Sequence, residues 1–263
     1  MHTLGSGLLS GALVGLVLGL IGGGGSILAV PMLIYIVGIG SPHVAIGTSA
    51  VAVATNALIN LGLHARYGTV KWRCAGVFAL AGMVGAWVGS LLGKATDGQR
   101  LLAVFGAVMM VVGLLMLRQR RGGEEPDVHL DMASVAKLAP RLIVTGTITG
   151  LASGYFGIGG GFLIVPALIF ATRMPILAAI GSSLVAVTLF GATTALNYSR
   201  SGLVDWPLAG AFITAGVPGG LLGSRLATAL SRQRHLLNTL FGVIVIGIGL
   251  YILLHGLTPI LRR

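Results

Sequence analysis

Two glycine-rich segments interrupt long apolar runs and leave backbone groups available for binding. The first reads GLIGGGGSILAVP over residues 19–31, and the second reads GYFGIGGGFLIVP over residues 154–166. Because glycine weakens a helix interior, each segment predicts a break followed by a half-helix. The first N–H groups of a helix are free and carry partial positive charge, so a helix start favours an anion. Glycine also lets a ligand approach the backbone closely.

The predicted substrate-binding residues are the backbone of both breaks and the hydroxyl groups of the helix after each break. Ser26 is a predicted N-cap, and Gly161 takes the matching place. We expect the two half-helix N-termini to meet near the membrane midplane and hold one small anion. The alternative is that the glycines only permit tight helix crossing. The predicted set is Gly22, Gly23, Gly24, Gly25, Ser26, Ile27, Thr48, Ser49, Gly157, Gly159, Gly160, Gly161, Phe162, Ser182 and Ser183. Pro31 and Pro166 are structural, since each lacks an N–H and frees a carbonyl one turn earlier.

Neutral polar residues recur at helical spacing in AIGTSAVAVATNALINLGLH, residues 45–64, and in the matching helix of the second half. Asn56, Asn60, Thr194 and Asn197 either line a substrate path or hydrogen-bond between helices, and both alternatives stay open. His64, near a helix end, is interpreted as interfacial rather than as a proton relay. Small residues repeat every fourth position and predict packing faces at Ala81, Gly85, Gly89 and Gly93 and at Ala215, Gly219 and Gly223.

The composition predicts an all-α polytopic membrane protein. The chain has 263 residues, 55% hydrophobic and 9% charged, with a mean hydropathy of +0.97. A soluble domain carries about 25% charged residues, and a helix needs about 20 apolar residues to cross a bilayer. The predicted apolar segments are 4–21, 26–39, 44–63, 73–93, 100–117, 141–156, 162–172, 177–198, 206–229 and 235–256.

Matching stretches in the same order indicate an internal duplication. AIGTS pairs with AIGSS, RYGTVKW with RSGLVDW, and AGMVGAWVGS with AGVPGGLLGS. We therefore divide the chain into a first repeat, 1–117, a cytoplasmic linker, 118–140, and a second repeat, 141–263. Each repeat holds four spans plus a half-helix. If each glycine break is a hairpin turn, the two repeats have inverted topology. If each break is a bend within one span, the repeats are parallel. The uncharged amino-terminal end favours inverted repeats. Such repeats are common in secondary transporters.

The charges separate several classes of function. The chain has 17 Lys and Arg residues against 6 Asp and Glu residues. The basic residues lie mostly in short loops, where they orient helices in a membrane, so the basic excess does not indicate nucleic acid as a partner. No carboxylate lies in the middle of an apolar segment, so the usual group for Na⁺ or H⁺ coupling is missing, which fits a neutral anion site. No catalytic, nucleotide or metal motif is present, so neither an enzyme, a cofactor nor a metal is predicted.

The sequence resembles the TauE/SafE sulfite exporter family, also called the TSUP anion permeases. The resemblance rests on three pairs of motifs: GLIGGGGSILAVP with GYFGIGGGFLIVP, AIGTS with AIGSS, and YGTVKW with SGLVDW. The resemblance covers the chain apart from the linker. It implies a multi-pass permease of the bacterial inner membrane for a small anion such as sulfite, a sulfonate or sulfoacetate, or thiosulfate. The family's breaks correspond to Gly22–Ser26 and Gly157–Gly161, with Ile158 standing where the first break has Gly23.

The expected partners are a small anionic substrate and membrane lipid, with a homo-oligomer left open. Other functions compete with the sulfur-anion permease. One is a carboxylate permease or an anion channel on the same scaffold, and another is a membrane accessory subunit that transports nothing.

Overall fold

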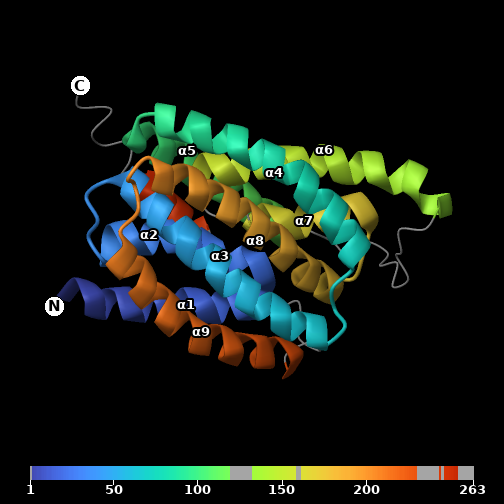
Figure 1. Ribbon diagram of the computed structural model, residues 1–263, viewed down its shortest axis with the longest axis horizontal. Helices are drawn as coiled ribbons and strands as arrows, with labels where there is room; N and C mark the ends of the chain where they lie inside the picture. Colours follow the sequence, from blue (N-terminus) through green and yellow to red (C-terminus); the bar gives the residue numbers. More distant parts are fainter. Residues whose placement is uncertain (1, 119–131, 158–160, 230–242, 244–245, 254–263) are drawn as a thin grey trace.

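The computed structural model describes residues 2–118, 132–157, 161–229, 243 and 246–253, and every regular element in these ranges is helical (Figure 1). An all-helical protein is therefore confirmed for the described residues. The elements are α1 (His2–Ile21), the 3₁₀ helix η1 (Gly22–Leu28), α2 (Ala29–Pro31), the π-helical η2 (Met32–Ile36), α3 (Pro42–Arg66), α4 (Trp72–Ala95), α5 (Gly98–Arg118), α6 (Met132–Phe156), α7 (Gly161–Thr172), α8 (Ile176–Arg200) and α9 (Trp206–Ala229).

Four helices are long and apolar enough to cross a membrane by length and composition. They are Pro42–Arg66, Trp72–Ala95, Leu177–Arg200 and Trp206–Leu226. The outer surface of α4 is apolar as well, since Leu80 and Val84 expose 64% and 66% of their area. A large contiguous apolar surface of this kind marks a face that meets lipid or a partner.

Small residues bring helices from distant parts of the chain into backbone contact. On α1, a Cβ added to Gly15 would meet the carbonyl of Gly216 on α9, and on α4 a Cβ added to Gly89 would meet the carbonyl of Leu151 on α6. Close approach of this kind lets helices associate through van der Waals contact. The packing faces predicted at the glycines are confirmed, because Gly85, Gly89 and Gly93 of α4 pack against α6, and Gly219 and Gly223 of α9 pack against α1.

Helices α3 and α8 pack against each other in opposite directions. Gly47 lies against Tyr198, while Gly191 lies against Ala54, so rising numbers on α3 meet falling numbers on α8. Figure 1 shows the same relation, since α3 runs from left to right and α8 from right to left. This antiparallel pair sets the distance between the two glycine breaks.

The first glycine break is a turn at which the chain folds back on α1 (Figure 1). A Cβ on Gly25 would collide with the backbone of Leu18, so only glycine fits this contact. Helical structure begins at Gly22 instead of Ile27, and the predicted N-cap at Ser26 is wrong because Ser26 lies inside η1. Pro31 ends α2, and a π-helical stretch follows, as expected where a missing N–H disturbs the hydrogen-bond ladder.

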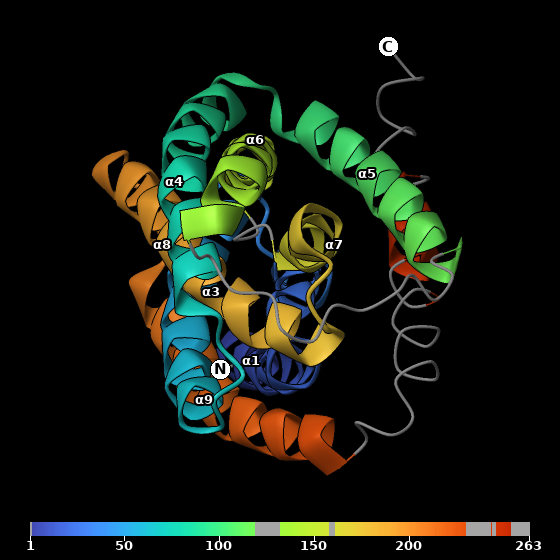
Figure 2. The ribbon, with the colours of Figure 1, turned by 90° about the vertical axis from the view of Figure 1, so that its right-hand side faces the viewer.

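Helix α6 begins earlier than predicted, and the last predicted span lies mostly outside the described residues. Helix α6 begins at Met132, inside the predicted linker, and contains Pro140. The predicted span 235–256 falls largely outside the described residues, but residues 246–253 are helical and pack on α5, where Gly249 meets Gly106. Figure 2 shows that α5 stands apart from the bundle of α1, α3, α8 and α9.

Candidate functional site

The first glycine turn reaches across to α8. Gly22 has a φ of +71°, in the left-handed region that favours glycine. A Cβ added to it would lie 2.8 Å from Cγ2 of Ile180 and 3.1 Å from Oγ of Ser183. The buried Ser183 hydroxyl donates to the carbonyl of Ile180 at 2.7 Å. We call Gly22–Gly25 with Ile180 and Ser183 the Gly22 site.

The second turn reaches across to α3 in the same manner. Gly157 has a φ of +66°, and an added Cβ would collide with the side chain of Ile46. The buried Ser49 hydroxyl donates to the carbonyl of Ile46 at 2.9 Å and lies 3.4 Å from the carbonyl oxygen of Gly157. We call Gly157 with Ile46 and Ser49 the Gly157 site. Its members stand at the sequence positions that match those of the Gly22 site.

The neighbouring hydroxyls hold loops in place. Thr48 Oγ1 accepts a hydrogen bond from the backbone N–H of Asp205 at 3.0 Å, and Ser182 Oγ accepts one from the backbone N–H of Lys71 at 2.9 Å. Both side chains are fully buried. Each hydroxyl thus ties the loop before α9 or α4 to the helix on which a glycine turn rests.

The two sites lie far apart along the bundle. Gly47 lies against Tyr198 and Gly191 against Ala54, and the same register continued along α8 matches Ser183 with residue 62 of α3, about 13 residues after Ser49. At 1.5 Å of rise per residue, this corresponds to roughly 20 Å. The prediction that both half-helix N-termini meet around one anion is therefore wrong. The two half-helices run side by side, with η1 packed on α7, and their N-termini point to opposite ends.

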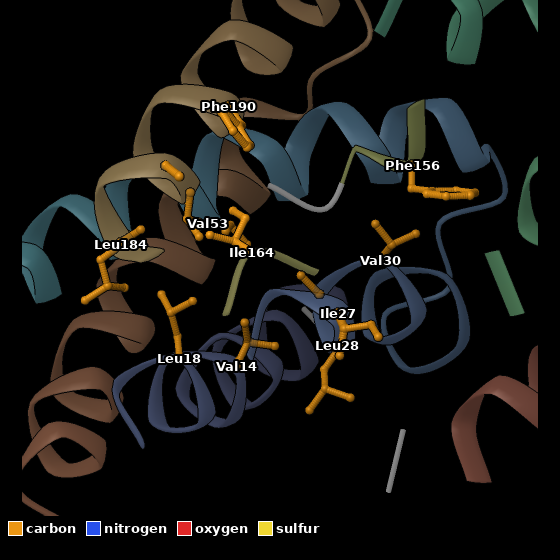
Figure 3. Packing of buried hydrophobic residues seen from close by; sticks show 14 of the residues in the cluster. Val14, Leu18, Ile27, Leu28, Val30, Val53, Phe156, Ile164, Leu184 and Phe190 are labelled. Atoms are coloured by element: carbon orange, nitrogen blue, oxygen red, sulfur yellow. The ribbon is translucent and has the colours of Figure 1, made fainter. Parts of the chain in front are cut away.

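Apolar side chains fill the space between the two sites. Ile27, Val30 and Ile164 are almost completely buried, and Figure 3 shows Ile164 beside Val53 and Val30 beside Phe156. Ile27 is predicted to bind the anion through its backbone N–H, and its side chain belongs to this apolar layer. The layer separates the two polar sites from each other.

Several predicted residues have incomplete descriptions. Gly159 and Gly160 lie outside the described residues, and the structure describes only the backbone elements of Gly23, Gly24, Gly161 and Phe162. Ser26 is fully buried within η1. Pro31 is buried in α2, and Pro166 lies inside α7.

The polar stripes of the two halves have different surroundings. On α3, Asn60 donates to the carbonyl of Asn56 at 2.8 Å, and these amides abut Gly220 and Gly216 of α9. The amide oxygens of both asparagines and the amide nitrogen of Asn56 have no hydrogen-bond partner. A path or bound water remains compatible with this stripe, because buried polar atoms are normally satisfied.

Asn197 on α8 forms hydrogen bonds between helices. Its amide donates to Ser90 Oγ at 2.6 Å and accepts from Lys94 Nζ at 2.6 Å. Lys94 also donates to the Asn197 carbonyl and to Ser201 Oγ, so it joins the end of α4 to the last turn of α8. Thr194, also predicted to line a path, is buried with its hydroxyl unpartnered. Sequence reasoning missed Lys94, whose only signal is its place in a helix end.

His64 lies in the last turn of α3, near a helix end as expected, but it is enclosed by other helices. Only 1% of its area is exposed, and the backbone of Gly19 on α1 adjoins its ring. The reason is that α1 and α9 cover the last turns of α3.

Comparison with known proteins agrees with the resemblance seen in the motifs. The family described as "Sulfite exporter TauE/SafE" matches residues 7–252. A "Probable membrane transporter protein" of Xylella fastidiosa (strain 9a5c) is 56% identical over 244 residues, covering 93% of this chain and 92% of its own. The "Probable membrane transporter protein YunE" of Bacillus subtilis is 28% identical over 272 residues, covering 94% and 96% of the two chains. No solved structure matches the chain.

Proposed function

Because this chain belongs to the sulfite exporter TauE/SafE family, we propose that it is a secondary transporter of a small sulfur-containing anion such as sulfite, a sulfonate or thiosulfate. The observation that carries the proposal is the pair of buried sites at Gly22 and Gly157. Each joins a glycine turn of one half to a serine on a helix of the other half. Relatives named as probable membrane transporters support a transporter and leave its substrate open.

We further propose two inverted repeats within a bacterial inner membrane, 1–117 and 141–263, joined by a cytoplasmic linker. The matching helices α3 and α8 run in opposite directions. In addition, the glycine turn of each half contacts the matching helix of the other half, and both observations support this arrangement. In transporters built this way, one half moves against the other and opens the substrate site to each side in turn.

Each site offers hydrogen-bond donors without a fixed charge. Backbone N–H groups at the start of a half-helix favour an anion, and a serine hydroxyl can rotate from its own helix carbonyl toward the anion. A sulfonate or sulfite presents several acceptor oxygens to such donors. The apolar layer at Ile27 and Ile164 blocks passage between the sites until the halves move, so it serves as the barrier that a carrier requires.

Transport by the purified protein in liposomes tests the proposal. Vesicles are loaded with unlabelled sulfite, methanesulfonate or thiosulfate, and uptake of the same labelled anion is followed, with acetate and oxalate in parallel. We expect saturable uptake that internal anion accelerates. Uptake of carboxylates alone identifies a carboxylate permease, and flux without saturation or counterflow identifies a channel. Absence of flux for every anion contradicts the proposal and favours an accessory subunit.

A further inference from the structure

A buried histidine stands next to the Gly22 turn. His64 lies in the last turn of α3, with the backbone of Gly19 on α1 beside its ring. Gly19 is three residues before the turn at Gly22. Figures 1 and 2 both show α1, α3 and α9 side by side. Among the described residues that are almost completely buried, His64 is the one whose unperturbed side chain changes charge near neutral pH.

The hydroxyl of Thr69 partners one nitrogen of this imidazole. The Thr69 oxygen lies 3.0 Å from the carbonyl oxygen of His64 and 3.1 Å from His64 Nδ1. It can donate to a bare Nδ1 or accept from Nδ1–H, so Nδ1 is partnered in either tautomer. A neutral imidazole keeps one bare lone pair, and a proton binds there. The other ring nitrogen, Nε2, is buried and has no partner.

Further unpartnered polar atoms continue from this nitrogen along α3. Asn60 lies one turn before His64 and Asn56 one turn earlier again, and both keep free amide oxygens. Both amides pack directly against the backbone of α9, at Gly220 and Gly216, where an added Cβ would collide with them. Buried polar groups left in this way are the usual partners of ordered water. The stripe thus leads from His64 toward the middle of α3.

The charged groups around this end of the bundle are basic. The exposed Arg66 follows His64 on α3, and the half-buried Lys71 lies in the loop that carries Thr69. Helix α9 contributes the exposed Arg225. On α1 the neighbour is the Gly19 backbone. The two described carboxylates, Asp97 and Asp205, lie at the opposite end, after α4 and before α9. Within the described residues, no carboxylate therefore neutralises a proton on His64, and a bound anion is the natural counter-charge.

We propose that the imidazole of His64 is a proton-binding site that couples proton movement to the transport of the anion. The inference rests on the proposed function and adds its coupling ion. A proton from the solution on one side binds the bare ring nitrogen while the anion occupies the adjoining Gly22 site, and the added positive charge compensates one negative charge of the anion during the crossing. After the halves move, the proton leaves the ring to the solution on the other side. His64 thereby takes the place of the membrane carboxylate that the chain lacks.

Proteoliposomes containing the pH dye pyranine test this coupling. The probes are methanesulfonate and thiosulfate, which remain fully ionised at neutral pH and cannot carry a proton themselves. Labelled-anion exchange is measured in the same vesicles. With wild-type protein we expect external anion to acidify the interior, and an inward proton gradient to accelerate uptake. The His64→Gln variant should lose the acidification, while His43→Gln, a half-buried position in the first turn of α3, should keep it.

The outcomes separate the two proposals. Wild-type exchange without internal acidification overturns the proton site and leaves transport standing, whereas no exchange of any anion overturns both. A His64→Gln protein with the wild-type ratio of protons to anions also overturns the site. If His64→Gln does not fold, Thr69→Val keeps the imidazole and removes the hydrogen-bond partner of Nδ1. We then expect a shifted pH profile of uptake, and an unchanged profile contradicts a proton site at His64.

Discussion

The Ser49 hydroxyl lies 3.4 Å from the carbonyl oxygen of Gly157, a residue of the other half of the chain. The matching pair, Ser183 and Gly22, makes the same approach, with 3.1 Å between the serine oxygen and the position of a glycine Cβ. Each half therefore completes a site on the other half. A movement of one half against the other must change both sites together, and the predictions below test the parts of this arrangement.

Replacing Gly22, which is closely packed, should destabilise the protein more than replacing Gly68, which has a similar positive φ but no neighbour within 4 Å. Gly22→Ala and Gly68→Ala place a Cβ at φ values of +71° and +67°, which costs about 1–2 kcal/mol in either case. Only Gly22 also meets Ile180, whereas Gly68 has open space, so overpacking adds about 1–3 kcal/mol. Thermal unfolding in detergent should show the larger fall in Tm for Gly22→Ala. Equal falls would mean that the turn is not closely packed.

Removing the site hydroxyls should reduce transport far more than stability. Ser49→Ala and Ser183→Ala each lose one hydrogen bond to a helix carbonyl, worth about 1 kcal/mol. Ser199→Ala is the matched control, because its hydroxyl also donates to a carbonyl three residues earlier but lies outside both sites. We expect comparable Tm values in all three variants and a strong loss of labelled-anion uptake in the first two. Wild-type uptake in Ser49→Ala and Ser183→Ala would remove these hydroxyls from the substrate sites.

Two glycine-to-alanine changes on α4 should have opposite signs. Gly89→Ala drives a methyl group into the backbone of α6 at Leu151 and Tyr155, and overpacking costs about 1–3 kcal/mol. Gly76→Ala meets nothing within 4 Å and improves helix propensity by up to about 1 kcal/mol. The Tm should fall for Gly89→Ala and stay or rise for Gly76→Ala. A rise at both positions would show that α4 and α6 are not in backbone contact.

The Lys94 and Asn197 pair should show strong coupling in a double-mutant cycle. Lys94→Met leaves the Asn197 amide oxygen without its charged donor, and hydrogen bonds to charged groups contribute about 1.5–3 kcal/mol. Because Asn197→Ala removes the same contact, the double variant should be less destabilised than the sum of the singles. Arg66→Met, at an exposed position on α3, should combine additively with Asn197→Ala. Additive behaviour of Lys94 with Asn197 would contradict the contact.

The glycine breaks and the small-residue faces could be predicted from the sequence because they are local. Gly22 and Gly157 need a backbone conformation that glycine alone adopts easily, and Gly85, Gly89 and Gly93 repeat at the spacing of one helix face. The start of the first half-helix was misplaced because packing against α1 keeps Gly22–Gly25 helical despite poor propensity. Propensity is a weak preference that tertiary contacts override.

The partners of each site could not be read from the sequence. Nothing in a single helix indicates that Ser49 meets Gly157, or that about 20 Å of α3 separates the two turns, since both depend on the register of α3 against α8. The burial of His64 likewise depends on α1 and α9, which cover a helix end that looks interfacial in isolation.

The amino-acid sequence by itself determined an all-helical, apolar chain, its two glycine breaks and its likeness to the TauE/SafE family, because periodicity, hydropathy and glycine conformation are properties of short segments. The tertiary structure alone decided that the breaks are two separate sites with an apolar layer between them, and that His64 is enclosed. These features arise from contacts between helices distant in the chain, where close packing of small residues fixes which side chains meet.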